Sequence, residues 1–461
     1  MKKIIVISVA ALAMCGWAVG KPRANLPKDP LLAKLAAQDA ALDRKYMKEG
    51  GLAFPGARGF GRAARGARAS SSPTVYHVTN LDDSGKGSLR DAVSKPGRIV
   101  VFDVAGVIKI KSRISFASGL YIAGQTAPGD GVTVYGNGCS FSGANDIICR
   151  YLRWRMGKCG TKGKDCAGIA NGRNMIFDHC SFSWGRDENF SINDNVSDKI
   201  GNITIQNCII SQGLLSHSAG GLVQANDITL YRNLYCDNVT RNNKLKGRSQ
   251  YANNIVYNWR NACVILGGGS KGESHSNITG NLFVNGPAGG GEGLGGGNER
   301  FHFYGDDNWQ DGDKDGKLDP NPVKTDGGGD RVFKPYPYPE LPLYPAKRLV
   351  ELTLATVGAS LPRRDPADLC VINEVLSFGT RGEIISDEKS IPGGAPTKWQ
   401  LREEGTGKRE EERRKRKDTD GDGIPDWWEK ANGTDKRNPH DAVAKAANGY
   451  LNIENYINSI R

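Results

Sequence analysis

The fold is decided by six short segments that recur along the middle of the chain: Arg150-Tyr151-Leu152-Arg153, His179-Cys180-Ser181-Phe182, Asn207-Cys208-Ile209-Ile210, Arg232-Asn233-Leu234-Tyr235, Asn253-Asn254-Ile255-Val256 and Gly280-Asn281-Leu282-Phe283. The second residues of successive segments lie 29, 28, 25, 21 and 27 positions apart. Most segments follow another strand-like run, such as Asn202-Ile203-Thr204-Ile205. A repeat of this length predicts a solenoid, and the absence of a helical period within each unit indicates coils of β-strand.

Stacking of the coils gives the repeat a physical reason. Each coil would place its Leu, Ile or Phe above the same position of the preceding coil, so the interior fills with aliphatic side chains that no single coil can bury. Asn233, Asn254 and Asn281 fall in one column, where their amides could bond from coil to coil. Simple turn chemistry is the alternative explanation for these three residues. The prediction of an all-β solenoid holds with either explanation.

The repeat region is flanked by shorter segments. Lys2, Lys3 and the apolar run up to Met14 predict an export signal peptide over residues 1–20. A lipid anchor at Cys15 is a less favoured alternative to a freely secreted protein, extracellular or periplasmic. No later stretch approaches the roughly 20 apolar residues of a membrane-spanning helix. The further divisions are a lead-in at 21–50, a β-domain at 51–400 with an irregular insertion at 286–345, a charged linker at 401–417 and a calcium module at 418–461.

The charge of the chain points to an anionic partner. Lys and Arg number 62 against 50 Asp and Glu, which gives a formal net charge of +12. Such a surface attracts nucleic acid, anionic lipid or an acidic polysaccharide. Export favours acidic polysaccharide over nucleic acid, and a monomer is the expected state. The alternative is that the basic residues only keep the surface soluble.

Cysteine and histidine give little evidence of a metal site. Nine of the ten cysteines would remain after cleavage of the signal peptide. Cys159 and Cys166 flank a polar loop and could form a disulfide, whereas Cys180 and Cys208 sit in apolar strand patterns and are expected to be buried thiols. The sequence contains no CxxC pair, and the six histidines are scattered.

One local motif predicts calcium binding directly. Asp418-Thr419-Asp420-Gly421-Asp422-Gly423-Ile424-Pro425-Asp426-Trp427-Trp428-Glu429 has the spacing of an EF-hand loop. The expected ligands are the side chains of Asp418, Asp420, Asp422, Asp426 and Glu429 and the carbonyl of Ile424. A second stretch begins in the same way at Asp311 but has Pro322 at position 12, so it is either a weak calcium site or a polar loop.

Several blocks resemble the pectate lyase family 1 of polysaccharide lyases. They are Ala53-Phe54-Pro55-Gly56-Ala57, Val75-Tyr76-His77-Val78-Thr79-Asn80-Leu81, Gly87-Ser88-Leu89-Arg90-Asp91-Ala92, Ile122-Ala123-Gly124-Gln125-Thr126-Ala127-Pro128-Gly129 and Asp178-His179-Cys180-Ser181-Phe182-Ser183-Trp184. They occur in family order and span about residues 51–395. The similarity is strongest to the exported bacterial branch with a C-terminal EF-hand or thrombospondin-3-like calcium module. It implies a right-handed single-stranded parallel β-helix with a small C-terminal calcium-binding helical module.

The resemblance also implies a reaction, which is calcium-assisted β-elimination of α-1,4-linked polygalacturonate. Calcium polarises the substrate carboxylate, and a base removes the acidified C5 proton. By position, Asp165, Asp187 and the neighbouring candidate Glu188 correspond to calcium ligands, and Arg241 corresponds to the base. Lys244 and Lys246 fall at substrate-binding positions where the family has arginine.

The chain departs from the family pattern at three places. Ser191 stands where the family often has another acidic ligand, and Asn243 stands where it has proline. No clear equivalent of the substrate-binding lysine occurs near His217-Ser218-Ala219. Two other functions therefore remain open beside the secreted lyase: a non-catalytic β-helix that binds polyuronate, and a calcium-stabilised surface adhesion protein.

Overall fold

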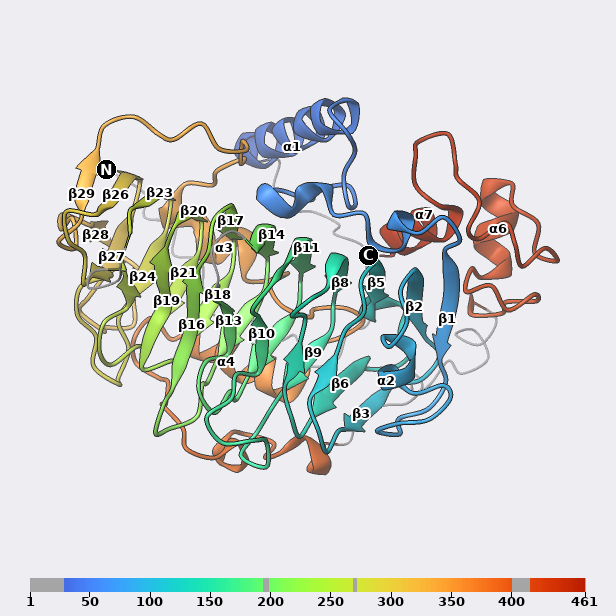
Figure 1. Cartoon of the computed structure of the whole chain (residues 1–461). Coiled ribbons are helices and arrows are strands. Elements are labelled where there is room, and N and C mark those ends of the chain that lie inside the picture. Colours follow the sequence, from blue (N-terminus) through green and yellow to red (C-terminus); the bar gives the residue numbers. More distant parts are fainter. Residues whose placement is uncertain (1–28, 194–198, 268–271, 400–414, 461) are drawn as a thin grey trace.

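The computed structural model describes residues 29–193, 199–267, 272–399 and 415–460. Its body is a stack of coils in which three sheets run along one axis (Figure 1). Each full coil adds one strand to each sheet, and neighbouring strands pair in parallel, as in the register of Phe177 with Ile205. The predicted parallel β-helix is confirmed.

The eleven-stranded sheet begins at the N-terminal coil. In spatial order it contains β1 (Thr74–Val78), β2 (Arg98–Phe102), β5 (Leu120–Ala123), β8 (Asn145–Arg150), β11 (Gly172–Asp178), β14 (Ile200–Gln206), β17 (Ile228–Tyr231), β20 (Arg248–Ala252), β23 (Ser274–Thr279), β26 (Phe301–Asp306) and β29 (Asp330–Val332). The eight-stranded sheet contains β4 (Ile114–Ser115), β7 (Cys139–Ser140), β10 (Ala167–Ile169), β13 (Phe190–Asn193), β16 (Ala219–Gln224), β19 (Thr240–Lys246), β22 (Val264–Ile265) and β25 (Leu294–Gly295).

The third sheet has ten strands. They are β3 (Gly106–Lys109), β6 (Val132–Tyr135), β9 (Arg153–Arg155), β12 (Ser181–Ser183), β15 (Ile209–Ser211), β18 (Leu234–Cys236), β21 (Ile255–Tyr257), β24 (Leu282–Val284), β27 (Trp309–Asp311) and β28 (Asn321–Pro322). β28 pairs with β27 in the antiparallel direction, which ends the sheet.

The recurring segments of the sequence form the corner between two of these sheets. Tyr151, His179, Asn207, Arg232 and Asn253 all have a positive φ, between 51° and 55°, and each immediately follows a strand of the eleven-stranded sheet. A left-handed residue turns the chain sharply there. In each case the strand of the ten-stranded sheet starts two residues later, so one corner conformation repeats from coil to coil.

The predicted asparagine column is confirmed as a ladder of hydrogen bonds. The amide nitrogen of Asn233 donates to Asn254 Oδ1 at 3.1 Å, and that of Asn254 donates to Asn281 Oδ1 at 3.2 Å. Asn281 continues the ladder to Asn308 at 2.8 Å. Cys180 and Cys208, which precede these residues in the column, are buried free thiols as expected.

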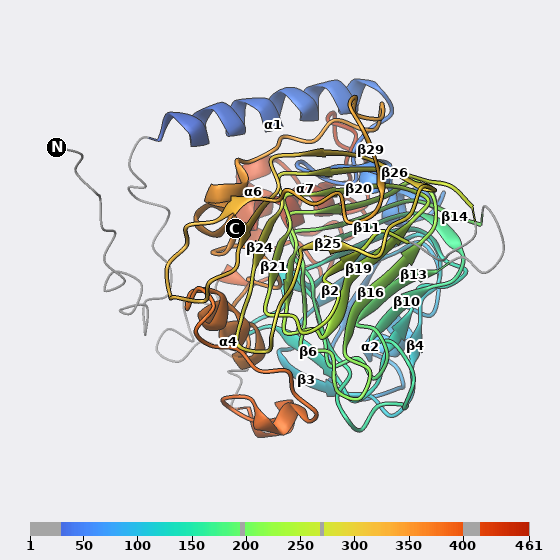
Figure 2. The ribbon, with the colours of Figure 1, turned by 90° about the vertical axis from the view of Figure 1, so that its left-hand side faces the viewer.

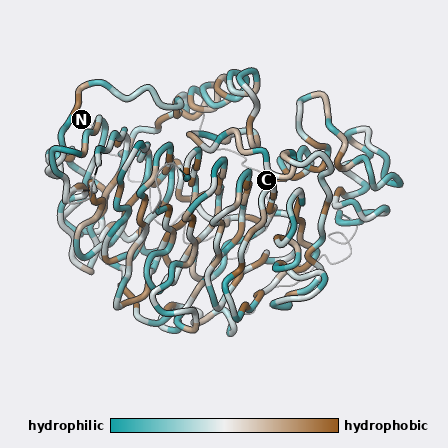
Figure 3. The backbone as a smooth tube through the Cα atoms, viewed as in Figure 1, coloured by the Kyte–Doolittle hydropathy of each residue, from teal (hydrophilic) through white to brown (hydrophobic). Residues whose placement is uncertain are grey.

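A continuous hydrophobic interior fills the coils. Its members come from all three sheets, and hydrophobic residues recur from coil to coil along the backbone (Figure 3). Phe177, Phe182 and Phe190 meet in this interior with ring centroids 4.7–6.3 Å apart. The free energy with which such a core stabilises the fold is roughly proportional to the apolar area that it removes from water.

Helices cover the outside of the stack. α1 (Pro30–Lys48) lies outside the strands (Figure 2), and α2 (Leu89–Ala92) is a single turn in the first coil. α3 (Leu349–Thr353) and α4 (Pro366–Val375) pack on the ten-stranded sheet through apolar residues such as Leu234 and Val371. α6 (Asp426–Asn432) and α7 (Asn452–Ser459) lie beside β1 (Figure 1).

Two sequence-based predictions require correction. The range 286–345 is not simply irregular, because it supplies β26, β27 and β29 to the final coils. Cys159 and Cys166 form no disulfide: Cys159 is exposed, whereas Cys166 is buried with its thiol directed to the carbonyl of Trp154 at 3.5 Å. The proposed signal peptide, Cys15 and most of the linker at 401–417 lie outside the described residues.

Within the described residues, no helix combines the length and the apolar character needed to cross a membrane.

Candidate active site

Four predicted site residues converge at the N-terminal ends of strands in the eight-stranded sheet. Asp165 precedes β10, Asp187 and Glu188 precede β13, and Arg241 is the second residue of β19. β10 pairs with β13, β13 with β16, and β16 with β19. Residues that are far apart in the sequence therefore meet because successive coils lie side by side.

The acidic side chains are close to one another. The backbone nitrogen of Glu188 donates to Asp165 Oδ1 at 3.2 Å. The side chain of Glu188 is 6% exposed, whereas that of Asp187 is 37% exposed. The cluster therefore has a buried side and an open side. Carboxylate oxygens are the donors that Ca²⁺ prefers.

Arg241 faces this acidic cluster directly. Its guanidinium donates to Glu188 Oε1. Arg241 also has a φ of +52°, the same left-handed conformation that the corner residues of the coils adopt. The predicted base and the predicted calcium ligands thus form one site.

His217 also belongs to the cluster, which the sequence did not predict. Its Nε2 lies 3.1 Å from Asp187 Oδ1, 3.9 Å from Glu188 Oε1 and 3.4 Å from Arg241 Nη1. The scattered positions of the histidines in the sequence did not indicate this grouping, in which the ring of His217 lies close to Asp187 and Glu188. The signal that could have found His217 is its position near the place where the family has a substrate-binding lysine.

Charge repulsion changes the acidity of the cluster. Burial and the neighbouring carboxylates of Asp165 and Asp187 raise the pKa of Glu188 to about 8, and Arg241 opposes this shift. Burial also raises the pKa of Asp165, with a further contribution from Asp187. A cation bound among these groups would relieve the repulsion. Ser191 interacts with Asp165 and stabilises its charged form.

Buried asparagines hold the two halves of the site together. Asn189 closes the acidic loop by accepting a bond from the backbone nitrogen of Gly185 at 2.9 Å. Its amide donates to Asn238 at 2.9 Å, and Asn238 donates to Asn242 at 2.9 Å. This network links the loop of Glu188 to the strand of Arg241 and ends at Asn242, whose amide nitrogen is buried without a hydrogen-bond partner among the described residues.

Lys244 and Lys246 extend the site with positive charge. Both are partly exposed on β19, on either side of the buried Leu245. Burial lowers the pKa of Lys246, and the nearby charges of Lys244 and Arg300 lower it further. The strand therefore presents several cations, which suits a polyanion better than a single small anion.

A second acidic cluster occupies the C-terminal module. The ligand atoms of Asp418, Asp420 and Asp422 lie within 4.8 Å of one another, and those of Asp422, Glu429 and Asp441 do so as well. Glu429 is fully buried, and within the described residues neither of its carboxylate oxygens has a hydrogen-bond partner. Burial and the surrounding carboxylates raise the pKa of Asp422 and of Glu429 to about 7.

The carboxylates that lie together differ from the ligand set expected for this loop. Asp426 is turned away from the cluster, because its carboxylate accepts bonds from the backbone and the hydroxyl of Thr419, each at 2.8 Å, and pairs with Lys417. Asp441 takes part instead, from a segment that the loop pattern does not include. Ile424 has a buried side chain, and its backbone nitrogen donates to Asp422 Oδ1 at 2.8 Å.

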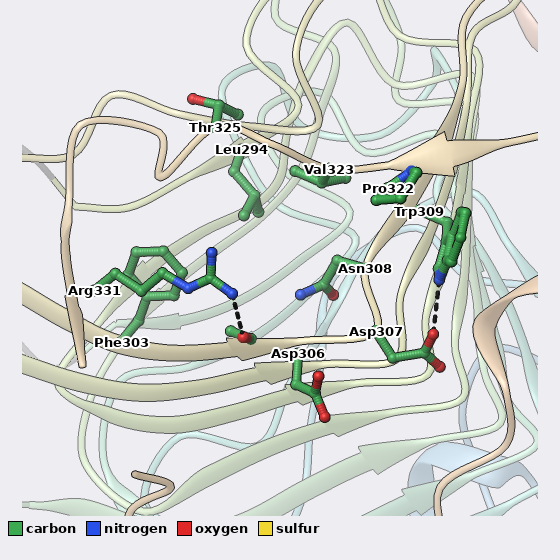
Figure 4. A pocket seen from close by; sticks show the side chains of 11 residues that line it. Leu294, Phe303, Asp306, Asp307, Asn308, Trp309, Pro322, Val323, Thr325 and Arg331 are labelled. Atoms are coloured by element: carbon green, nitrogen blue, oxygen red, sulfur yellow. Dashed lines mark hydrogen bonds between the residues drawn. The ribbon is translucent and has the colours of Figure 1, made fainter. Parts of the chain in front are cut away.

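Two other features lie away from these clusters. Asp311, Asp313 and Asp319 come together in the second predicted loop, largely at the surface. A pocket of about 330 Å³ opens in the last coils, lined among others by Phe303, Arg331 and Trp309 (Figure 4). Neither feature includes a residue of the Arg241 site.

Comparison with known proteins identifies the family. No family model matches the chain. A probable pectate lyase C of Aspergillus flavus is 49% identical over 416 residues, which cover 89% of this chain and 94% of the relative. A probable pectate lyase C of Neosartorya fischeri is 49% identical over 444 residues, which cover 94% and 97%.

Among solved structures, the crystal structure of Jun a 1, the major allergen from cedar pollen, covers 68% of this chain and 95% of its own with 18% identity. The TM-score of this match is 0.46. The two relatives named above are fungal, and the expected placement in an exported bacterial branch stays a prediction. The identity and coverage of these relatives show that the chain belongs to the pectate lyase family and is a polysaccharide lyase.

Proposed function

We propose that the chain cleaves α-1,4-linked polygalacturonate by β-elimination, with Arg241 as the base. The observation that carries the proposal is the contact between Arg241 and Glu188 inside an acidic cluster, in a chain of this family. The relatives are described as pectate lyases, which supports pectate as the substrate class.

Asp165, Asp187 and Glu188 are the proposed ligands of a catalytic calcium ion. Their oxygen donors fit Ca²⁺, and the raised pKa values of Asp165 and Glu188 indicate a site that gains from a bound cation. Bound calcium would polarise the substrate carboxylate and stabilise the enolate-like charge that develops at C5.

The protein's own groups bind the substrate and move the proton. Lys244 and Lys246 hold substrate carboxylates through charge, although an ammonium lacks the two-point geometry of arginine. Arg241 in its neutral form removes the C5 proton and becomes a guanidinium. The electron pair forms the C4–C5 double bond, the C4–O bond breaks, and the departing oxygen takes a proton from water to release the shortened chain. Because Glu188 stabilises the protonated guanidinium, this contact must weaken before proton transfer.

For the C-terminal module we propose a structural calcium site made by Asp418, Asp420, Asp422, Glu429 and Asp441. The fully buried and unpartnered carboxylate of Glu429 supports it, because an isolated buried charge is costly. The loop also packs closely against the first coil at Gly423, where a Cβ would lie 3.0 Å from Ile453 and 3.2 Å from Val75 of β1. Calcium would therefore stabilise the packing of the C-terminal module on the first coil.

The remaining proposals concern the mature protein. We propose that residues 1–20 are removed on export and that the secreted protein acts as a monomer. Mass spectrometry of the exported chain should find Lys21 at its N-terminus, and light scattering should give the mass of one chain. A lipidated N-terminus at Cys15 would overturn the first of these expectations.

The test of the main proposal is the ultraviolet absorbance of unsaturated products from polygalacturonate. Wild type should produce this absorbance only with calcium, and Asp187→Asn should require more calcium without a lower melting temperature. If wild type binds several polyuronates but produces no unsaturated product, the non-catalytic binding protein replaces the enzyme. Asp187→Asn is needed because a chelator alone would also empty the C-terminal site.

A further inference from the structure

Two thiols and two carboxylates from distant parts of the chain meet between α4 and the ten-stranded sheet. Cys236 is the last residue of β18, and Asp237 follows it. Cys370 and Glu374 lie on α4, four positions apart, so both side chains project from one face of the helix. Neither the proposed catalytic site nor the calcium module uses these residues.

Three of the four donor atoms have the spacing of ligands around one small cation, and the fourth, Cys370 Sγ, lies beside one of them. Cys236 Sγ lies 3.1 Å from Asp237 Oδ2, and Cys370 Sγ lies 3.5 Å from Glu374 Oε1. The ligand atoms of Cys236, Asp237 and Glu374 all lie within 4.8 Å of one another. In a tetrahedral zinc site, with Zn–S of about 2.3 Å and Zn–O of about 2.1 Å, neighbouring donors are roughly 3.4–3.8 Å apart.

Neighbouring side chains hold these donors in place. Asn258 donates to the buried Asp237 at Oδ1, with a distance of 2.6 Å, which leaves the other oxygen toward Cys236. The amide of Gln212 lies 3.9 Å from Cys370 Sγ. Such outer contacts orient the ligands of protein metal sites. Within the described residues, Glu374 Oε2 is buried and has no hydrogen-bond partner.

The cluster carries excess negative charge when its groups ionise. Burial and Asp237 raise the pKa of Glu374 to about 10, and Glu383 adds further repulsion. Burial and Asp237 likewise raise the pKa of Cys236. The metal-free cluster therefore holds protons that a divalent cation would displace on binding.

We propose that Cys236, Asp237, Cys370 and Glu374 form a structural binding site for a thiophilic divalent cation of the zinc class. Two sulfur and two oxygen donors suit zinc, whereas calcium takes six to eight oxygen ligands. Cys236, Asp237 and Glu374 form the close group, and Cys370 joins it through its contact with Glu374. The ion would tie α4 to β18 and so fix the C-terminal segment on the outside of the coils. It is independent of the catalytic calcium and of the C-terminal calcium module.

Cobalt provides a spectroscopic test, because a Co²⁺–thiolate bond gives a charge-transfer band in the near ultraviolet. The full chain is purified in reducing buffer, saturated with calcium to fill the oxygen-only sites, and titrated with Co²⁺. Wild type should develop the band with one equivalent of Co²⁺ and lose it when Zn²⁺ is added. Elemental analysis after dialysis should find one zinc per chain.

Variants distinguish a metal site from a buried pair of carboxyl groups that shares a proton. Glu374→Gln keeps the shape and the hydrogen bonding of a protonated Glu374, so it should fold and keep elimination activity, yet bind Co²⁺ at least tenfold more weakly. Cys370→Ser should weaken the band as well, and Cys159→Ser, which removes an exposed thiol elsewhere, should leave it unchanged. No band in wild type, a band that persists in both cluster variants, or a Cys236–Cys370 disulfide in the non-reduced protein would each overturn the proposal.

Discussion

The two acidic clusters of this molecule contain the same kind of ligand but face different surroundings. The cluster of Asp165, Asp187 and Glu188 is partly open and is contacted by Arg241 and His217. The C-terminal cluster surrounds the fully buried Glu429, whose oxygens have no partner within the described residues. A partly open cluster beside an arginine suits the proposed catalytic role, whereas a cluster around a buried carboxylate suits the proposed structural role.

The largest expected effect is a loss of turnover at the Arg241 site that leaves the stability of the C-terminal module unchanged. Arg241→Lys should lower kcat by about 10²–10⁴-fold, the usual contribution of a general base, while the calcium-dependent gain in melting temperature stays. Product absorbance and thermal unfolding measure the two quantities on the same sample. Arg331→Lys, in the last coil, is the matched control and should keep full activity. Near-normal turnover in Arg241→Lys would remove Arg241 as the base.

The next effect concerns stability. Calcium at about 100 times its Kd should add about 2.7 kcal/mol to the free energy of unfolding. Glu429→Gln should lose most of this gain, and product absorbance measured well below the melting temperature should remain near that of wild type.

Asp426→Asn is the sharper control for the C-terminal cluster. Loop spacing makes Asp426 a ligand, whereas the structure pairs it with Thr419 and Lys417. Asp426→Asn should therefore keep the calcium-dependent gain in melting temperature, and Asp441→Asn should lose it. The opposite result would show that Asp426, and not Asp441, is the calcium ligand.

The pH dependence of stability should differ with and without calcium. The folded-state pKa values of Asp422 and Glu429 are raised to about 7, above their ordinary values. The folded protein then holds more protons than the unfolded one, so the calcium-free protein should lose stability as pH rises from about 4 to about 7. Calcium should remove this loss, because the ion stabilises the ionised carboxylates. Denaturant unfolding at several pH values, with and without chelator, measures the difference, and equal slopes would contradict it.

The smallest effect is expected at His217. His217→Ala removes contacts to Asp187 and Arg241 without removing a ligand or the base, so kcat/KM should fall by roughly fivefold, the equivalent of about 1 kcal/mol. His217→Lys should recover part of the loss if the ring acts through positive charge toward the substrate. A loss as large as that of Arg241→Lys would instead give His217 a direct part in proton transfer.

The coils and the grouping of Asp418, Asp420 and Asp422 could be predicted because their information is local. Recurring segments encode the corners, the asparagine ladder and the buried Cys180 and Cys208 in residue order alone. The range 286–345 was misjudged because glycine-, aspartate- and proline-rich connections surround its short strands. β26 nevertheless buries Phe301 and Phe303 in the core and pairs with β23. The proposed disulfide failed because spacing along a loop does not show that Cys166 turns inward while Cys159 remains exposed.

The sequence by itself determined the solenoid, the family and the carboxylates that could hold calcium. Only the tertiary structure decided which groups meet: His217 with Asp187 and Arg241, Asp441 in place of Asp426, and α4 against Cys236 and Asp237. The physical reason is that a repeat is specified by the period of neighbouring residues. A site instead depends on the lengths of several successive coils and on the packing of distant segments against them.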